Sequence, residues 1–387
     1  MSPQLTECED VAWYRELSAA RGAAAALARR VGLDEQRSGQ VALAVSEAAS
    51  NLDKHAVDGA ILLRVVRTAG AAGVAGVEFL AVDSGPGMAD VPGSMRDGTS
   101  GTGTLGIGLG SVARLADVFD VHSLPGRGTV MLARFWPRDP VRSLHGPAPL
   151  PPEPVVAGIT RPISGEQVCG DAWAVRVDSG SGADPGTGAA GPDAARPDPA
   201  RPLAESIRRG LAATVPGPAL GPGLLVMLCD GLGHGPMAAM AAEAAVRALR
   251  GGSGTHPEQV VREVHHALRG TRGAAVAVAR IEPRAGRLLF CGVGNISAVL
   301  LDRDTRTSLV SYPGIAGHQL RGLRTFEQPL PPESTLVLHS DGLTERWNAE
   351  SLPGLLSHPP VVVAGQLLRE AGIRHDDAGV VVAKGAW

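Results

Sequence analysis

The chain has 387 residues with a formal net charge of -3, 44% hydrophobic residues and 3% aromatic residues. This length favours two domains, and so few aromatics mean that their cores are built from Ala, Val and Leu. The near-neutral charge lacks the excess of basic residues that is typical of proteins that bind nucleic acid. The sequence shows no signal peptide and no apolar run of membrane-spanning length, and its four cysteines have no paired spacing. We therefore expect a soluble, cytoplasmic protein without nucleic-acid or membrane partners.

The N-terminal part is predicted to begin with two helices. The first, over residues 13–31, is rich in Ala and Arg, and the second, over 35–55, follows Asp34 as a capping residue. On the second helix Glu47 and Asn51 lie one turn apart, away from the apolar positions. By itself this pair is more typical of a solvated polar face than of a site.

A glycine-rich pattern follows these helices. The motif Asp-Ser-Gly-Pro-Gly begins at Asp83, and a loop rich in Gly, Ser and Thr then leads through Gly103-Thr-Leu-Gly-Ile-Gly-Leu-Gly into another helix. Glycines let the backbone approach a ligand closely, and the N–H groups at a helix start can receive phosphate oxygens. Strands are predicted on both sides of this pattern, at 61–67, 77–82, 118–123 and 129–135.

The order of these motifs over about residues 11–136 resembles the GHKL (Bergerat) ATP-binding fold, in its branch of small anti-sigma-factor kinases. The resemblance implies an α/β sandwich, domain 1–136, that binds ATP with Mg²⁺. It makes Glu47 the base that activates the attacking hydroxyl, Asn51 a Mg²⁺ ligand and Asp83 the acceptor of the adenine amino group. It assigns nucleotide contacts to these glycines: Gly85, Gly87, Gly103, Gly106, Gly108 and Gly110. The family contains both kinases and modules that only bind nucleotide, so phosphate transfer stays open.

Two segments are predicted to lie outside the packed cores. Residues 137–154 are too proline-rich for a helix or a paired strand, so we interpret them as a semi-extended linker. Residues 178–223 are dominated by Gly, Ala, Pro, Ser and Asp, a composition that buries too little apolar surface to offset chain entropy. We expect this second segment to be a mostly disordered insertion in the C-terminal domain, 155–387.

The C-terminal domain is organised around residues 224–235, an apolar run that ends in Asp230 among glycines. An unpaired buried charge is costly, so this carboxylate should face a cation or take part in catalysis. Similar settings hold Asp171, Asp341 and Asp376 at the ends of other predicted strands. Each one alone is more typical of a turn, but together they indicate one shared site. Oxygen ligands with few His or Cys favour Mg²⁺ or Mn²⁺ over zinc.

The remaining elements alternate strands with a few helices. Strands are predicted at 155–162, an edge strand, and at 173–177, 274–282, 287–294, 297–302, 334–340 and after Asp376. Helices are predicted at 236–249, 257–269 and 360–371. The motif order Gly-Asp, Asp-Gly-Leu-Gly-His-Gly, Cys-Gly-Val-Gly-Asn, Ser-Asp-Gly-Leu-Thr-Glu and Asp-Asp-Ala-Gly resembles the PPM-type metal-dependent Ser/Thr phosphatases, in their bacterial SpoIIE-type branch. The resemblance covers about 155–387 and implies an α-β-β-α sandwich.

This second resemblance also implies the metal ligands. Asp171 and Asp230 would bridge two Mn²⁺ or Mg²⁺ ions, Gly231 would add a backbone carbonyl, and Asp341 and Asp376 would hold the second ion. Two such ions lower the pKa of a bridging water, so that hydroxide attacks phosphorus in line without a covalent intermediate. Catalysis is therefore expected to depend on Asp230.

We make separate predictions for three further residues. His234 either assists the leaving oxygen or only satisfies its turn, whereas His339 is expected to be a packed core histidine. Gly379 stands where the phosphatase family often has Thr, a departure that removes no assigned ligand.

Together the two halves predict a bifunctional regulator of bacterial partner switching. Its phosphatase and its ATP-binding, kinase-like module would act in opposite directions on a small anti-anti-sigma (STAS-type) protein, and a sigma factor is a further candidate partner. The alternative is a nucleotide-sensing anti-sigma binding protein whose phosphatase half is an inactive scaffold. The intact aspartates named above argue against that alternative.

Overall fold

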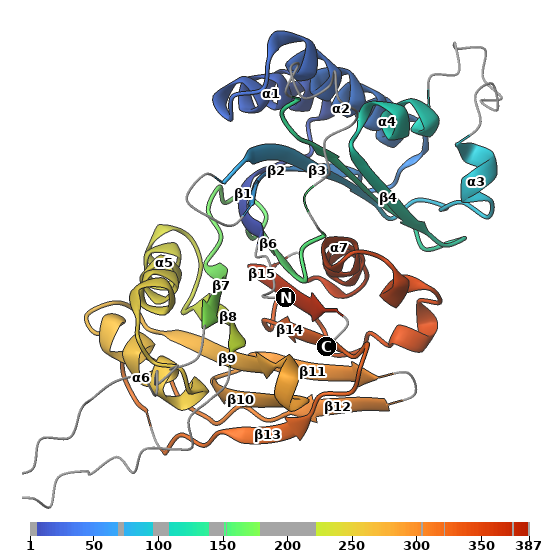
Figure 1. Ribbon diagram of the computed structural model, residues 1–387. Helices are drawn as coiled ribbons and strands as arrows, with labels where there is room; N and C mark the ends of the chain where they lie inside the picture. The colour runs from blue at the N-terminus through green and yellow to red at the C-terminus, as the bar shows by residue number, and fades with distance from the viewer. Residues whose placement is uncertain are drawn as a thin grey trace, which may run out of the picture.

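The computed structural model describes residues 6–68, 73–95, 108–138, 151, 153–178, 222–302, 305–320, 322–373 and 375–385 (Figure 1). In these ranges the strands form three five-stranded sheets. One sheet belongs to the N-terminal half, and two belong to the C-terminal half. None of the helices in the described ranges has the length and apolar character that crossing a bilayer requires.

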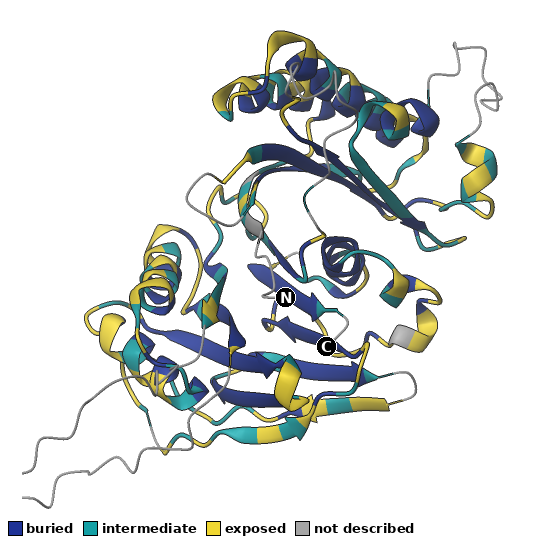
Figure 2. Ribbon diagram, viewed as in Figure 1, coloured by how far each residue is buried: buried dark blue, intermediate teal, exposed yellow. Residues whose placement is uncertain are grey.

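The N-terminal sheet has the strand order β1-β2-β3-β5-β4 and is antiparallel throughout. Its strands are β1 (Thr6–Tyr14), β2 (Ala60–Thr68), β3 (Ala75–Asp83), β4 (Val118–Ser123) and β5 (Thr129–Phe135). The helices of this half are α1 (Leu17–Arg30), α2 (Glu35–His55), α3 (Val91–Ser94) and α4 (Leu109–Leu115). Helices α1 and α2 cover one face of the sheet with small apolar side chains (Figures 1 and 2).

Local sequence signals explain most of this half. The side chain of Asp34 accepts a hydrogen bond from the N–H of Arg37 at 2.6 Å, so the predicted cap of α2 is confirmed. Strand β1, however, was not predicted, and the first helix starts at Leu17 rather than at 13. The acidic residues of β1 hide its strand pattern, because Asp10 pairs with the buried Arg64 of β2 only in the folded protein.

The C-terminal half is a sandwich of two antiparallel sheets with helices on its outer faces, which confirms the predicted α-β-β-α class. One sheet has the order β13-β10-β9-β8-β7 and the other β12-β11-β14-β15-β6. The first contains β7 (Asp171–Asp178), β8 (Gly223–Gly231), β9 (Ala274–Glu282), β10 (Arg287–Val293) and β13 (Phe326–Pro329). The second contains β6 (Val156–Arg161), β11 (Ser297–Asp302), β12 (Thr305–Leu309), β14 (Thr335–His339) and β15 (Ala378–Lys384).

Helices α5 (Pro236–Gly251) and α6 (Pro257–Ala267) pack on the first of these sheets. Helix α7 (Pro360–Ala371) packs on the second. Short 3-10 turns lie at Pro283–Ala285, Ala349–Ser351 and Leu355–Ser357. Strands β12 and β13 were not predicted, because they are short edge strands with mostly polar, exposed residues. Strand β6 is an edge strand, as expected.

The two segments predicted to be unpacked lie mainly outside the described residues. Of the linker 137–154, residues 139–150 and 152 are not described. Of the insertion 178–223, only its ends are described, where Asp178 of β7 pairs in register with Gly223 of β8.

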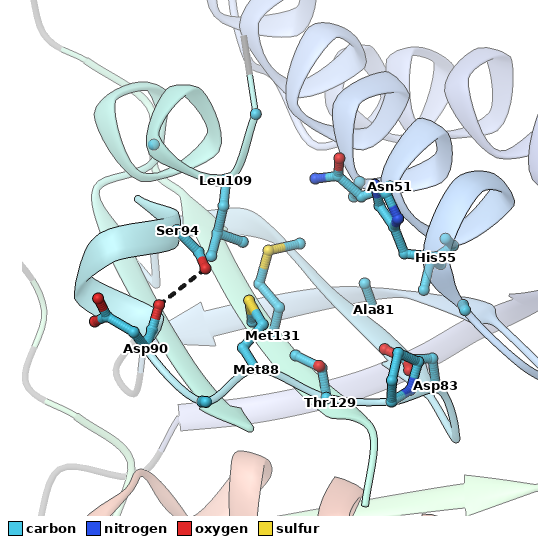
Figure 3. Close-up of a pocket in the computed structure, with 18 of the residues that line it drawn as sticks. Asn51, His55, Ala81, Asp83, Met88, Asp90, Ser94, Leu109, Thr129 and Met131 are labelled. Carbon is cyan, nitrogen blue, oxygen red and sulfur yellow. Dashed lines mark hydrogen bonds between the residues drawn. The ribbon is translucent and has the colours of Figure 1, made fainter. Parts of the chain in front are cut away.

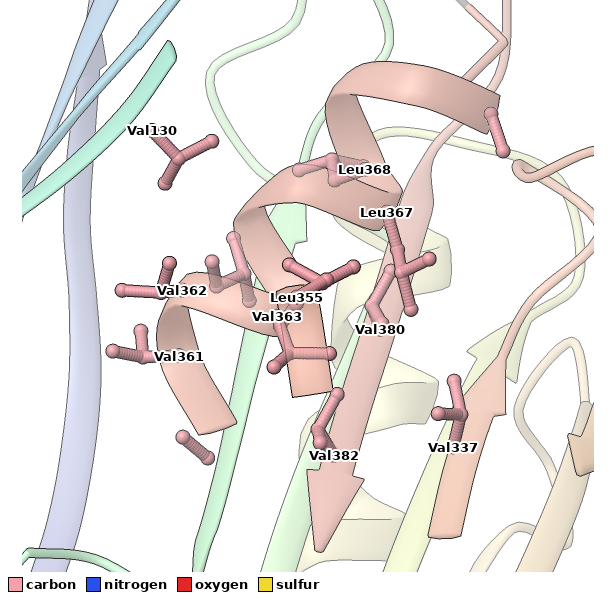
Figure 4. Close-up of a cluster of buried hydrophobic side chains, with 14 of the residues drawn as sticks. Val130, Val337, Leu355, Val361, Val362, Val363, Leu367, Leu368, Val380 and Val382 are labelled. Carbon is pink, nitrogen blue, oxygen red and sulfur yellow. The ribbon is translucent and has the colours of Figure 1, made fainter. Parts of the chain in front are cut away.

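Helix α7 joins the two halves. Most of its residues are buried, because one side contacts β15 and β6 while the other contacts the N-terminal sheet (Figures 2 and 4). One apolar cluster therefore contains Leu80 and Val130 from the N-terminal half together with Val362, Leu367 and Val380 from the C-terminal half. A helix that is apolar on all sides needs such a buried position.

Polar contacts reinforce this junction at β1 and β6. The indole N–H of Trp13 donates to the carbonyl of Thr160 at 2.8 Å, and the N–H of Thr160 donates to Asp10 at 2.8 Å. The guanidinium of Arg64 donates to the carbonyl of Gly158 at 2.6 Å. The unpredicted strand β1 thus connects the two halves.

Candidate functional sites

The N-terminal half contains a cavity of about 770 Å³ between α2, β3, β5 and α4 (Figure 3). Its size suits a small-molecule ligand. Asn51 and His55 reach it from one face of α2, and Asp83 reaches it from the end of β3. Other lining side chains, which sequence analysis did not identify, are Met88, Leu109, Thr129 and Met131. The three apolar ones, Met88, Leu109 and Met131, gave no signal of their own in the sequence, because core residues have the same character.

Asp83 is a buried acceptor in this cavity. Its side chain is only 9% exposed, and one of its oxygens accepts the N–H of Gly85 at 2.7 Å. Burial raises the pKa of this carboxyl above its ordinary value, although the bond from Gly85 opposes the shift. A carboxyl in such a place can recognise a hydrogen-bond donor on a ligand.

Only some of the glycines that were predicted to contact nucleotide lie at the cavity. Gly87, Gly108 and Gly110 line the cavity, whereas Gly103 and Gly106 lie outside the described residues. Gly87 has a φ of +65°, and a Cβ there would collide with the carbonyl oxygen of Leu124, so no other residue fits without rearrangement. Gly85 adjoins Asp83 without lining the cavity.

Glu47 lies on α2 one turn before Asn51 and is half-buried. It is not among the residues that line the cavity. The structure thus gives Asn51 and Asp83 a direct place at the cavity and Glu47 an adjacent one.

In the C-terminal half, the fold brings the predicted carboxylates together. Strands β7 and β8 pair so that Asp171 stands directly opposite Asp230. Asp341 follows β14, and its side chain lies close enough to Asp230 to share a hydrogen bond. Asp376 precedes β15, and its charge acts on both Asp171 and Asp230. Four positions far apart in the sequence therefore share one end of the sandwich.

The electrostatics of this cluster are unfavourable without a counter-charge. Burial and, after it, the neighbouring charges of Asp171, Asp341 and Asp376 together raise the pKa of Asp230 to about 9. Burial also raises the pKa of Asp171 to about 7, while a bond from Ser340 opposes the shift. The pKa of Asp376 is raised, first by burial and then by Asp341.

These residues fit a divalent cation by their chemistry. The Oδ1 atom of Asp171 is buried and has no hydrogen-bond partner. A cation would satisfy this oxygen and relieve the repulsion between the carboxylates. Within the described residues, no three His, Cys, Asp or Glu side chains are already gathered into a formed metal cluster. The aspartates offer the oxygen donors that such a cation takes.

Two residues that sequence analysis did not assign hold Asp171 in place. The hydroxyl of Ser340 donates to Oδ2 of Asp171 at 2.6 Å and accepts the N–H of Gly379 at 2.9 Å. Asp377 accepts the N–H of Gly170 at 2.7 Å, which fixes the residue before Asp171. Each of these two neighbours a predicted ligand in the sequence, and that adjacency is the signal that could have identified them.

Other residues near the cluster have simpler roles. The side chain of Asn295 donates to Asp341. His339 is buried, and its ring faces the indole N–H of Trp347, so the expected core position is confirmed. His234 is 59% exposed, and its Nδ1 atom lies 3.4 Å from a carboxylate oxygen of Glu166. Gly231 is buried directly after Asp230.

Comparison with known proteins agrees with this division of the chain. Residues 221–384 match the family model described as Stage II sporulation protein E (SpoIIE), and residues 12–135 match that of the histidine kinase-like ATPase domain. Over 123 residues the chain is 35% identical to the serine/threonine-protein kinase RsbT of Bacillus subtilis (strain 168), which covers 32% of this chain and 90% of RsbT.

Solved structures show weaker similarity. A protein from a study of the bacterial stressosome is 26% identical, with a TM-score of 0.44, over 59% of this chain and 98% of its own. The PPM Ser-Thr phosphatase MsPP from Mycobacterium smegmatis is 15% identical, with a TM-score of 0.39, over 59% of this chain and 97% of its own. Similarities at these scores support no functional argument by themselves.

Proposed function

Since the chain belongs to the SpoIIE-type PPM protein phosphatases, fused to an RsbT-type histidine kinase-like ATPase domain, we propose that it removes phosphate from a partner protein with the help of divalent cations. The observation that carries this proposal is the register of β7 and β8, which sets Asp171 opposite Asp230 beside Asp341. The substrate would be phosphoserine or phosphothreonine in a small anti-anti-sigma (STAS-type) protein.

The proposed ligands of two Mn²⁺ or Mg²⁺ ions are Asp171, Asp230, the carbonyl of Gly231, Asp341 and Asp376. Such ions supply a nucleophilic hydroxide and hold phosphoryl oxygens. The protein supplies the positioning.

Ser340 occupies one oxygen of Asp171 and leaves the other free, and Asp377 fixes the backbone before it. A protein thiolate is disfavoured as nucleophile, because burial raises the pKa of the nearby Cys169 well above its ordinary value.

The N-terminal cavity is proposed to bind ATP with Mg²⁺. Asp83 would accept the adenine amino group, Asn51 would bind Mg²⁺, and the glycine-rich segment would contact the phosphates. Glu47 next to Asn51 supports phosphate transfer to the same partner as a second activity. Sequestration of a sigma factor by this module remains the competing proposal, since nucleotide binding alone does not require Glu47.

The decisive experiment measures phosphate release with Mn²⁺ from p-nitrophenyl phosphate and from a phosphorylated STAS-type protein. We expect Asp230→Asn to lower turnover about 100-fold or more, because a metal site contributes several kcal/mol to the transition state. Glu243→Gln, an exposed position on α5, serves as the control and should retain activity. If wild type and Asp230→Asn released phosphate equally, the proposal would be wrong.

Transfer of labelled γ-phosphate from ATP to the unphosphorylated partner tests the second activity. Binding of ATP without any transfer, in wild type and in Glu47→Gln alike, would favour the sequestration proposal.

A further inference from the structure

Helix α7 packs against strands that carry residues of both candidate sites. On one side it packs against the N-terminal sheet so closely that a Cβ added at Gly365 would lie 3.1 Å from Val130 and 3.2 Å from Leu80 (Figure 4). On the other side it packs against β15, the strand that follows Asp376. Because packed interiors are dense, a displacement of this helix is felt on both sides.

The last turn of α7 is connected to the nucleotide cavity. The turn between β4 and β5 is bonded to the loop after Asp83, with the N–H of Gly126 donating to Pro86 at 2.7 Å and that of Gly128 donating to Gly85 at 3.0 Å. From the same turn, Arg127 donates to Glu370 of α7 at 2.6 Å.

The neighbouring arginine of α7 reinforces this connection. Arg369 is 8% exposed, and it donates to Glu370 at 2.5 Å. Its positive charge acts directly on Asp83. A residue of the phosphatase half thus forms part of the electrostatic environment of the proposed adenine acceptor.

The same turn of α7 is connected to the carboxylate cluster. The N–H of Thr344 donates to the carbonyl of Ala371 at 2.9 Å, and the N–H of Ile373 donates to the carbonyl of Gly342 at 2.7 Å. These two hydrogen bonds fix the loop that begins with Asp341 to the end of α7. Asp376 follows Ile373 by three residues. The end of α7 is therefore close in sequence to Asp376 and is hydrogen-bonded to the loop that contains Asp341.

We propose that adenine nucleotide in the N-terminal cavity and divalent cation at Asp341 and Asp376 strengthen each other's binding through the last turn of α7. Nucleotide that orders the loop after Asp83 also orders the end of α7 and, with it, the loop that begins with Asp341. A cation that binds afterwards therefore loses less conformational entropy. This coupling rests on the proposed function, and it is reciprocal by thermodynamic necessity.

The test measures Mn²⁺ affinity of the full chain from the electron paramagnetic resonance signal of free Mn²⁺. The nucleotide is a cobalt(III) complex of ATP, whose own metal does not exchange with Mn²⁺. We expect saturating complex to tighten Mn²⁺ binding about fivefold or more, the lower end of typical coupling. A smaller change, or weaker binding, would overturn the coupling.

Matched variants test the route. Glu370→Gln removes the negative charge that pairs with Arg127, and Glu258→Gln removes the one that pairs with Arg262 in a comparable exposed pair on α6. The effect of nucleotide should shrink at least twofold in Glu370→Gln and persist in Glu258→Gln. An equal effect in both variants would overturn the route through α7. If Mn²⁺ does not bind even without nucleotide, the proposed function itself fails, and this outcome is distinct from unchanged affinity.

Discussion

Single side chains decide how the carboxylates of the cluster are held. The carboxylate of Asp171 accepts a hydrogen bond from the hydroxyl of Ser340 at 2.6 Å, which favours one orientation of the side chain. The hydroxyl also satisfies the N–H of Gly379, where a Cβ would lie 3.0 Å from the Oδ2 atom of Asp171. A side chain at 379 would therefore press on Asp171.

Ser340→Ala is expected to weaken Mn²⁺ binding about 10- to 100-fold, because outer-shell partners of metal ligands typically contribute this much. The measurement is the Mn²⁺ concentration that half-saturates phosphate release, together with direct Mn²⁺ binding. Ser351→Ala, which removes an exposed hydroxyl bonded to the carbonyl of Asn348, is the control. Equal Mn²⁺ affinities in the two variants would show that Ser340 does not position Asp171.

Asp83→Asn is expected to weaken ATP binding about 10- to 100-fold, the equivalent of one hydrogen bond to a charged group. The amide NH₂ of Asn must face one of the donors that now point at the carboxylate, including Gly85 and Thr129. Calorimetry with ATP measures the change, and Asp53→Asn on the exposed side of α2 is the control. Unchanged affinity would remove Asp83 from the nucleotide site.

At the scale of elements, helix α7 is the component whose environment differs most from what its own sequence suggests. Its run of Val and Leu is that of any core helix, and nothing in it indicates that two different sheets cover it. Gly365 permits the close approach of the N-terminal sheet. The helix therefore contributes to two cores.

Gly365→Leu is expected to lower the free energy of unfolding by about 1–3 kcal/mol, because the added atoms overpack the contact with Val130 and Leu80. Urea denaturation measures this change. Gly22→Ala on α1 is the contrasting control: no atom lies within 4 Å of its added Cβ, so it should stabilise the protein by about 0.5–1 kcal/mol. Stabilisation by both variants would contradict the tight packing around α7.

At the scale of the whole molecule, one buried charged side chain bonds to both halves. Arg64 is fully buried and bonds to Asp10, to Glu78 and to the carbonyl of Gly158 in the C-terminal half. Removing one partner of such a network leaves uncompensated charge inside the protein. We therefore expect the two halves to unfold together.

Arg64→Met is expected to cost about 3–5 kcal/mol in unfolding free energy, as for other broken buried ion pairs. Urea unfolding followed by both fluorescence and phosphatase activity measures the cost and tests whether the transitions coincide. Arg262→Met, at an exposed pair with Glu258, should change stability by about 0.5 kcal/mol or less. Two separate transitions in the wild type would contradict the single unit.

The sequence by itself determined the elements with strong local signals and the chemical types at the sites. The cap at Asp34, the helical period of α2 and the apolar run into Asp230 depend on neighbours along the chain, so spacing alone reveals them. Carboxylates at predicted strand ends likewise indicated a cation site.

Only the tertiary structure decided which partners these groups meet. Strand β1 is acidic because Asp10 meets Arg64 across the sheet, and Ser340 matters because it reaches Asp171 from 169 positions away. The placement of α7 between two sheets depends on surfaces that are far apart in the chain. Long-range contacts of this kind leave no periodic trace in the sequence, because burial depends on what packs against a residue and not on its neighbours along the chain.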